Sequence, residues 1–206
     1  MKKIILTIIM LFAGLLPVQL SAQDQQVIDS LLTAIEETKS PDKETVTQYI
    51  LVAQQYTNID SLKFVHYLGE AEKLADLIGD KEGKITAKAT FGDVFFFRGY
   101  YQEMRDHFEQ IAEESAKAGF KRGESSALKY IGIAYRMLGN RDTAIMIHDR
   151  SLELAKEIDH KALIAQNYYN LGINYDYAGN SSKAMEYFEI SIEISQEIGN
   201  TVMTCN

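Results

Sequence analysis

The feature that most constrains the fold is a 40-residue repeat that continues without gaps from residue 41 to residue 200. Aligning 41–80, 81–120, 121–160 and 161–200 places the same residue types in the same columns. Three columns are rich in glycine: Val52, Gly92, Gly132 and Gly172; Ile59, Gly99, Gly139 and Gly179; and Gly79, Gly119, Asp159 and Gly199. A fixed period of about 20 to 50 residues is typical of a solenoid, whose units pack only on their neighbours. The sequence therefore predicts an extended binding surface instead of a deep pocket.

Each repeat is predicted to contain two helices joined by a tight turn. In the last repeat, Gly179 can adopt the left-handed conformation that ends the first helix, and Asn180 can cap the second. Apolar residues recur at steps of three and four on either side of this turn, as an amphipathic helix requires. The predicted helices cover 43–58, 61–78, 83–98, 101–118, 122–138, 141–158, 162–178 and 181–198.

The column that contains Gly132 and Gly172 has a packing explanation. Where the two helices of a unit cross closely, a side chain at this point would push them apart. We expect the alanine column, Ala144 and Ala184, to face these glycines from the second helix.

The order of residue types within a unit resembles the tetratricopeptide repeat. The last unit contains the pattern Tyr168-x-x-Leu171-Gly172-x-x-Tyr175, followed by Ala184-x-x-x-Phe188, and the third unit contains most of the same pattern. The resemblance covers 41–200 and implies an all-α fold, a right-handed α-solenoid of helix-turn-helix repeats. The usual unit has about 34 residues, so this chain would be a long variant.

The segments outside the four repeats have separate interpretations. Residues 1–22 combine a basic start, an apolar run and small residues, which is typical of a secretory signal peptide. An uncleaved membrane anchor is the alternative, although the apolar run is shorter than the ~20 residues of a spanning helix. An amphipathic helix at 25–38 indicates an N-terminal capping helix over 23–40. Residues 201–206 match the start of a truncated fifth repeat.

Composition narrows the range of partners and chemistry. The formal net charge is −8, and an acidic surface repels phosphate backbones, so we expect no nucleic-acid partner. The histidines lack the spacing of metal ligands, and the single cysteine, Cys205, has no histidine near it in sequence. No phosphate-binding loop or pair of catalytic carboxylates stands out. We therefore expect no catalytic, cofactor-binding or metal-binding residues, and no cofactor.

The resemblance places ligand contacts on the first helix of each unit, which lines a concave face. By column, the candidate protein-binding residues are Tyr49, Tyr56, Phe96, Lys129, Ile133, Arg136, Tyr169, Ile173 and Tyr177. Aromatic residues and arginine are enriched at interface hot spots, and a peptide or a partner helix fits such a surface. Packing on the neighbouring unit is the alternative role of the aromatic residues. Only Lys129 and Asn170 match the clamp with which related arrays bind a C-terminal carboxylate.

These observations predict a non-enzymatic scaffold that is exported to the periplasm or another extracytoplasmic space and binds a protein or peptide. The alternative is the extracytoplasmic sensor region of a larger membrane signalling protein, such as a histidine kinase or a transcriptional regulator, truncated here. In that case the membrane would be reached only through a missing C-terminal region. A membrane helix after residue 206 would favour the sensor, and a polar capping helix would favour the free scaffold.

Overall fold

The computed structural model describes residues 21–57 and 59–199. Residues 1–20, most of the predicted signal peptide, and 201–206, the predicted start of a fifth repeat, lie outside this part. Within it, no helix combines the length and the apolar character needed to cross a membrane. The chain divides into two compact units, Met1–Val94 and Phe95–Asn206, which we describe separately.

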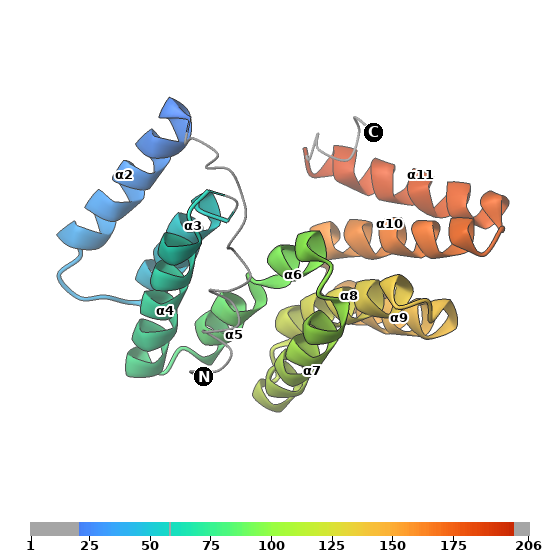
Figure 1. Cartoon of the computed structure of the whole chain (residues 1–206), viewed down its shortest axis with the longest axis horizontal. Helices are drawn as coiled ribbons and strands as arrows, with labels where there is room; N and C mark the ends of the chain where they lie inside the picture. Colours follow the sequence, from blue (N-terminus) through green and yellow to red (C-terminus); the bar gives the residue numbers. More distant parts are fainter. Residues whose placement is uncertain (1–20, 58, 200–206) are drawn as a thin grey trace. The chain divides into compact units, whose positions relative to one another are not determined.

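The first unit contains the predicted capping helix and the first repeat. Helix α2 (Ala22–Glu37) packs on α3 (Lys43–Gln55), α3 packs on α4 (Ser61–Ile78), and α4 packs on α5 (Lys81–Ala89) (Figure 1). Side-chain caps define where α2, α3 and α4 begin, because Ser21, Asp42 and Asp60 accept hydrogen bonds from backbone N–H groups of the first turn. Large apolar side chains fill the core between these helices, among them Ile28, Val46, Phe64 and Leu68.

The single helix predicted at 83–98 is divided in two in the structure. Helix α5 ends at Ala89, and α6 (Gly92–Arg98) begins after a turn at Thr90 and Phe91. Thr90 and Gly92, on either side of Phe91, both have low helix propensity, and the Thr90 hydroxyl donates to the Thr86 carbonyl at 3.0 Å. Phe91 is 7% exposed and meets the Phe64 ring edge-on at 5.1 Å. The break thus places Phe91 in the core of the first unit.

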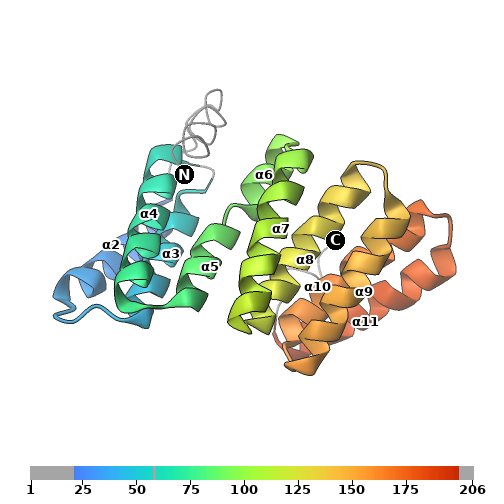
Figure 2. The ribbon, with the colours of Figure 1, turned by 90° about the horizontal axis from the view of Figure 1, so that it is seen from below.

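The second unit is a regular succession of long helices. Helices α7 (Tyr101–Ala118), α8 (Lys121–Met137), α9 (Arg141–Glu157), α10 (Lys161–Tyr177) and α11 (Ser181–Glu197) each pack on the next (Figure 2). Helix α8 also contacts α10. These bounds lie within one residue of the predicted ones. The prediction of an all-α, tetratricopeptide-like solenoid is confirmed.

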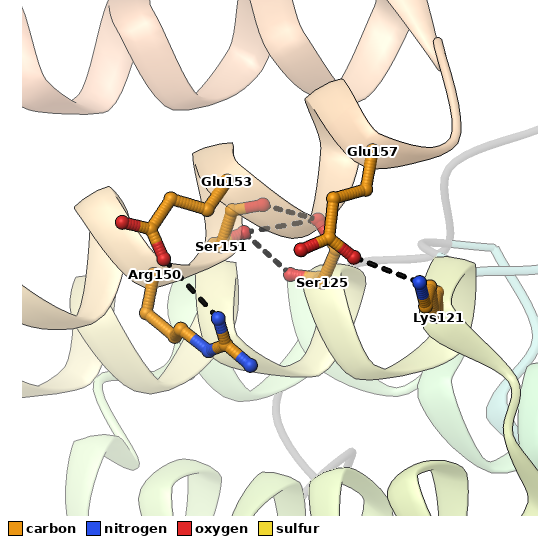
Figure 3. Close-up of polar contacts among 6 residues, drawn as sticks. All are labelled: Lys121, Ser125, Arg150, Ser151, Glu153 and Glu157. Atoms are coloured by element: carbon orange, nitrogen blue, oxygen red, sulfur yellow. Dashed lines mark hydrogen bonds and ion pairs between the residues drawn. The ribbon is translucent and has the colours of Figure 1, made fainter.

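Polar contacts repeat with the same 40-residue period as the sequence. Lys121 at the start of α8 pairs with Glu157 at the end of α9 at 2.8 Å, and Lys161 pairs with Glu197 in the next repeat (Figure 3 shows the first pair). On the same two helices, α8 and α9, Ser125 and Ser151 each donate to the other's carbonyl oxygen, at 2.9 and 2.7 Å. Small side chains therefore let α8 and α9 approach closely, and buried hydrogen bonds join them there.

The same close approach recurs in the last repeat. The Ser191 hydroxyl on α11 donates to the Ala165 carbonyl on α10 at 2.8 Å, in the columns of Ser151 and Ser125. One hydrogen bond of the reciprocal pair is missing because alanine has no hydroxyl. Helices α10 and α11 remain in contact without this hydrogen bond. A small side chain, serine or alanine, is therefore what the two repeats have in common at this position.

Left-handed residues end the helices as the glycine columns predict. The values of φ at Gly79, Gly99, Gly119, Gly139, Gly179 and Gly199 lie between 67° and 87°. Asp159 occupies the column of Gly119 and Gly199, and it has a φ of 49°. An aspartate accepts this conformation at some energetic cost, since its Cβ crowds the backbone.

The glycines inside the first helices face a different residue from the one predicted. A Cβ on Gly172 would lie 2.6 Å from the Phe188 ring, and a Cβ on Gly132 would lie 2.6 Å from the His148 ring. Ala144 and Ala184 are buried, but the residues nearest to these glycines are His148 and Phe188, not the alanines that the sequence predicts. These rings, four residues after the alanines in sequence, occupy the space that a side chain on the glycine would need.

Candidate protein-binding face

Six of the nine predicted binding residues lie on two helices that contact each other in the second unit. We call this set the first-helix face; it consists of Lys129, Ile133 and Arg136 on α8 with Tyr169, Ile173 and Tyr177 on α10. Tyr169 is 41% exposed and Tyr177 is 61% exposed. The other four are partly exposed. The first-helix face therefore presents aromatic, aliphatic and cationic groups to solvent at once.

The two cations of this face make hydrogen bonds to amides on α10. The Lys129 ammonium donates to Gln166 Oε1 at 3.0 Å, and the Arg136 guanidinium donates to Asn170 Oδ1 at 3.3 Å. The Lys129 ammonium also lies 4.2 Å from the centre of the Tyr130 ring. Burial lowers the pKa of Arg136, while Tyr177 and Tyr169 act in the opposite direction. These contacts hold both cations against α10.

The three other predicted residues have different surroundings. Tyr56 is 3% exposed and stacks on Tyr67 at 5.8 Å, so it belongs to the core of the first unit and offers no contact surface. Tyr49 is partly exposed and stacks on the same Tyr67 ring at 6.4 Å. Phe96 is partly exposed on α6, where it contacts Phe97 and Tyr101.

A cluster of buried polar side chains lies next to Arg136. It consists of His148 on α9 with Asn167 and Asn174 on α10, all 0% exposed. In the part of the chain that is described, both nitrogens of His148 and both amide atoms of Asn174 have no hydrogen-bond partner. Burial lowers the pKa of His148 from 6.5 to about 3, and the charges of Arg136 and Lys129 also lower it. Asn167 opposes this shift, although its contact with the ring is too poorly aligned to count as a hydrogen bond.

The sequence contains a sign of this cluster, because its three residues are polar at repeat positions that are apolar in other repeats. His148 occupies the column of Phe108 and Phe188, and Asn167 and Asn174 occupy columns that contain Ala127 and Ala134 one repeat earlier. Three polar residues thus replace apolar ones in core columns of neighbouring helices. His148 is fully buried, and its amide neighbours were not recognised from the sequence.

The described residues suggest no metal centre. Among residues 21–57 and 59–199, no group of three or more His, Cys, Asp or Glu side chains is placed to hold a metal ion. The first-helix face and its amide partners contain no nucleophile beside a base. Its chemistry suits recognition of a partner through aromatic contact, amide hydrogen bonds and positive charge.

Comparison with known proteins supports the fold assignment. Residues 123–197 match the sequence profile of the tetratricopeptide repeat. This stretch contains all of α9, α10 and α11 and most of α8. The comparison with curated proteins returned no match.

Several solved structures share the fold at low sequence identity. Aspartyl phosphate phosphatase F from Bacillus subtilis has a TM-score of 0.67 and 16% identity, over 88% of this chain and 51% of that one. The Rap conjugation gene regulator of plasmid pLS20, in complex with the Phr* peptide, has a TM-score of 0.76 and 13% identity, over 88% and 50%. Bacillus thuringiensis PlcR, in complex with the peptide PapR7 and DNA, has a TM-score of 0.71 and 13% identity, over 98% and 72%.

These similarities define the class of the protein as a tetratricopeptide-like, all-α repeat protein. The chain spans about half the length of the phosphatase and of the Rap regulator. At these identities the comparison establishes the fold alone.

Proposed function

We propose that this protein is a non-enzymatic interaction scaffold that binds an extended peptide, or a peptide-like segment of a partner protein, on the first-helix face. The proposal rests on a group of side chains on α8 and α10, two helices that contact each other. Tyr169 and Tyr177 are exposed there, and Arg136 donates a hydrogen bond to the amide of Asn170. Exposed aromatic rings beside arginine are typical of interface hot spots. Amide side chains can in addition pair with the main chain of an extended ligand.

Peptide complexes among the similar structures support the same proposal. The pLS20 Rap regulator is described with the Phr* peptide, and PlcR with the peptide PapR7. The phosphatase shows that the fold is also found in a protein named for an activity. A binding role is favoured here because the first-helix face carries no nucleophile–base pair.

The class of partner rests on two further arguments. A net charge of −8 disfavours nucleic acid, and this remains an argument from charge because the PlcR complex contains DNA. The apolar leader at 1–22 supports export to an extracytoplasmic space. Fractionation of the native cell would test export, and recovery of the protein in the cytoplasm with residues 1–22 intact would contradict it.

A second candidate is the ligand-binding region of a larger signalling protein. Both the Rap protein, named as a gene regulator, and the PlcR complex with peptide and DNA support a repeat array that serves regulation. In that case the first-helix face would bind the signal, and a further region would transmit it. The native mass in the membrane fraction distinguishes this candidate from a free scaffold.

The proposal can be tested with a pool of randomised heptapeptides passed over the immobilised protein and quantified by mass spectrometry. We expect Tyr169→Asp to abolish retention. The matched control is Met146→Asp, since Met146 is 67% exposed on α9, a second helix. Equal retention by the parent, Tyr169→Asp and Met146→Asp, with equal melting curves, would contradict a binding site on the first-helix face.

A further inference from the structure

Large apolar side chains are exposed near the ends of α6, α8 and α10 in the second unit. Phe97, Met137 and Tyr177 occupy the same column of three successive repeats, and all three are exposed. Leu138, which follows Met137 at the turn between α8 and α9, is exposed as well. A single exposed apolar side chain is ordinary, but several at one place on a surface are typical of an interaction site.

Two arginines flank the Tyr177 ring at the turn between α8 and α9. The Arg141 guanidinium, at the start of α9, lies 5.7 Å from the centre of this ring. Burial lowers the pKa of Arg136, in the last turn of α8, and Tyr177 opposes this shift, so these two side chains are also close together. The ring therefore lies against the turn that carries Met137 and Leu138. We call Met137, Leu138, Arg141 and Tyr177 the turn cluster.

The Tyr177 ring keeps a free surface although an arginine lies beside it. The Arg122 guanidinium lies at a similar distance from another ring, 5.3 Å from the centre of Phe120, but Phe120 is 7% exposed and is covered by the core. Tyr177, in contrast, is 61% exposed. The contact with Arg141 thus orients the Tyr177 ring and leaves much of it open to a ligand.

The groups of the turn cluster favour an aromatic side chain over an aliphatic one. An aromatic ring packs edge-on or offset on a second ring, the face of a ring attracts a guanidinium, and a ring edge makes favourable contacts with a methionine sulfur. Tyr177, Arg141 and Met137 supply these three partners. The negative face of a ring complements the charge of the arginines, whereas an aliphatic side chain would gain only from its buried area.

We infer that the turn cluster is a subsite for one aromatic side chain, Phe, Tyr or Trp, of the peptide bound on the first-helix face. This inference rests on the proposed function. Tyr169, Ile173 and Tyr177 follow one another at steps of four along α10, so they lie on one side of the helix and lead to the turn cluster at its end. A bound peptide can therefore reach the turn cluster without leaving the first-helix face.

Two pools of heptapeptides test this preference. Both pools are N-acetylated and amidated, and their variable positions are drawn from Gly, Ala, Ser, Thr, Asn and Gln. One position, placed anywhere in the peptide, is Phe, Tyr or Trp in the aromatic pool and Leu, Ile or Met in the aliphatic pool. Retention of both pools on the immobilised full chain is measured by mass spectrometry, and the ratio of the two is compared between variants.

We expect the aromatic pool to be retained about two- to tenfold above the aliphatic pool, the range of one additional aromatic or cation–π contact. Tyr177→Ala should remove this preference, and Arg141→Gln and Met137→Ala should each lower it. Arg122→Gln and Met146→Ala are the matched controls, because both residues are exposed on α8 and α9 outside the turn cluster. Their ratio should equal that of the parent. A purely structural effect would change the retention of both pools together and leave the ratio unchanged.

The outcomes separate this inference from the proposed function. If the parent retains both pools equally while Tyr169→Asp abolishes retention, the peptide site stands and the aromatic subsite is refuted. A preference that persists in Tyr177→Ala also refutes the subsite. Should Tyr177→Ala release both pools, an unchanged ratio in both Arg141→Gln and Met137→Ala refutes it instead. If neither pool is retained above the level of Tyr169→Asp, both the subsite and peptide binding on the first-helix face are refuted.

Discussion

Replacement of His148 by phenylalanine should make the protein much less sensitive to acid. His148 is 0% exposed, and burial lowers its pKa from 6.5 to about 3. Phenylalanine occupies the same column at Phe108 and Phe188, and the Phe188 ring lies against Gly172 as the His148 ring lies against Gly132. The substitution His148→Phe should therefore preserve the fold while it removes the titrating group.

The sign and size of the effect follow from the two pKa values. Between pH 6.5 and about 3, the unfolded chain binds a proton at His148 and the folded chain does not. Stability that is present above pH 6.5 is therefore lost as the pH falls towards 3, by about 1.4 kcal/mol per pH unit. From about pH 7.5 to about pH 4.5, this residue alone should reduce the free energy of unfolding by roughly 2 to 3 kcal/mol.

Urea unfolding followed by circular dichroism at the two pH values measures this difference. Carboxylates such as Glu113 and Glu157, whose pKa values are lowered by Lys117 and Lys121, contribute equally to parent and variant and cancel in the comparison. His148→Gln, which also removes the titration, separates loss of the proton site from a gain in packing. An equal loss of stability in the parent, His148→Phe and His148→Gln would refute the assignment of a buried neutral histidine.

Two further predictions concern the backbone and the helix contacts. Gly172→Leu should cost on the order of 1–3 kcal/mol in the free energy of unfolding, since a Cβ there would lie 2.6 Å from the Phe188 ring. Gly69→Leu is the matched control, because a Cβ on this helical glycine meets nothing within 4 Å and leucine favours the helix. Thermal melts that rank the two variants in the opposite order would contradict the packing. Asp159→Gly should raise the stability by roughly 0.5–1 kcal/mol, because the strain of a residue at φ 49° exceeds the entropy lost by glycine. A lower melting temperature for Asp159→Gly would show that the aspartate side chain makes a larger contribution than its backbone strain.

The sequence predicts the helices well and their contacts less well. Helices α7 to α11 begin and end within a residue of the prediction because each boundary depends on local groups, such as Asn140, Asn180 and the left-handed glycines. The break at Thr90 and Phe91 was not predicted, since it depends on the packing of Phe91 against Phe64, far away in sequence.

For the candidate site, too, the sequence predicts where residues lie on their helices but not which residues they contact. Column positions placed Tyr169, Tyr177 and Arg136 on one face of adjacent first helices. They could not show that Tyr56 is buried under Tyr67, because that depends on the degenerate first repeat and on how its rings stack. They also could not show that Arg136 donates a hydrogen bond to Asn170, since the amide comes from the next repeat.

Site-specific photo-crosslinking in the native cell tests the central claim most directly, because it captures a partner whose identity is not known. A photoreactive phenylalanine analogue would replace Tyr169 or Tyr177 on the first-helix face, or Met146 or Met185, which are 67% and 62% exposed on the second helices. A partner on the first-helix face predicts one adduct of the same mass from the positions of Tyr169 and Tyr177 and none from the positions of Met146 and Met185. An adduct from Met146 or Met185, with none from Tyr169 and Tyr177, would contradict the claim and place the interface on the second helices.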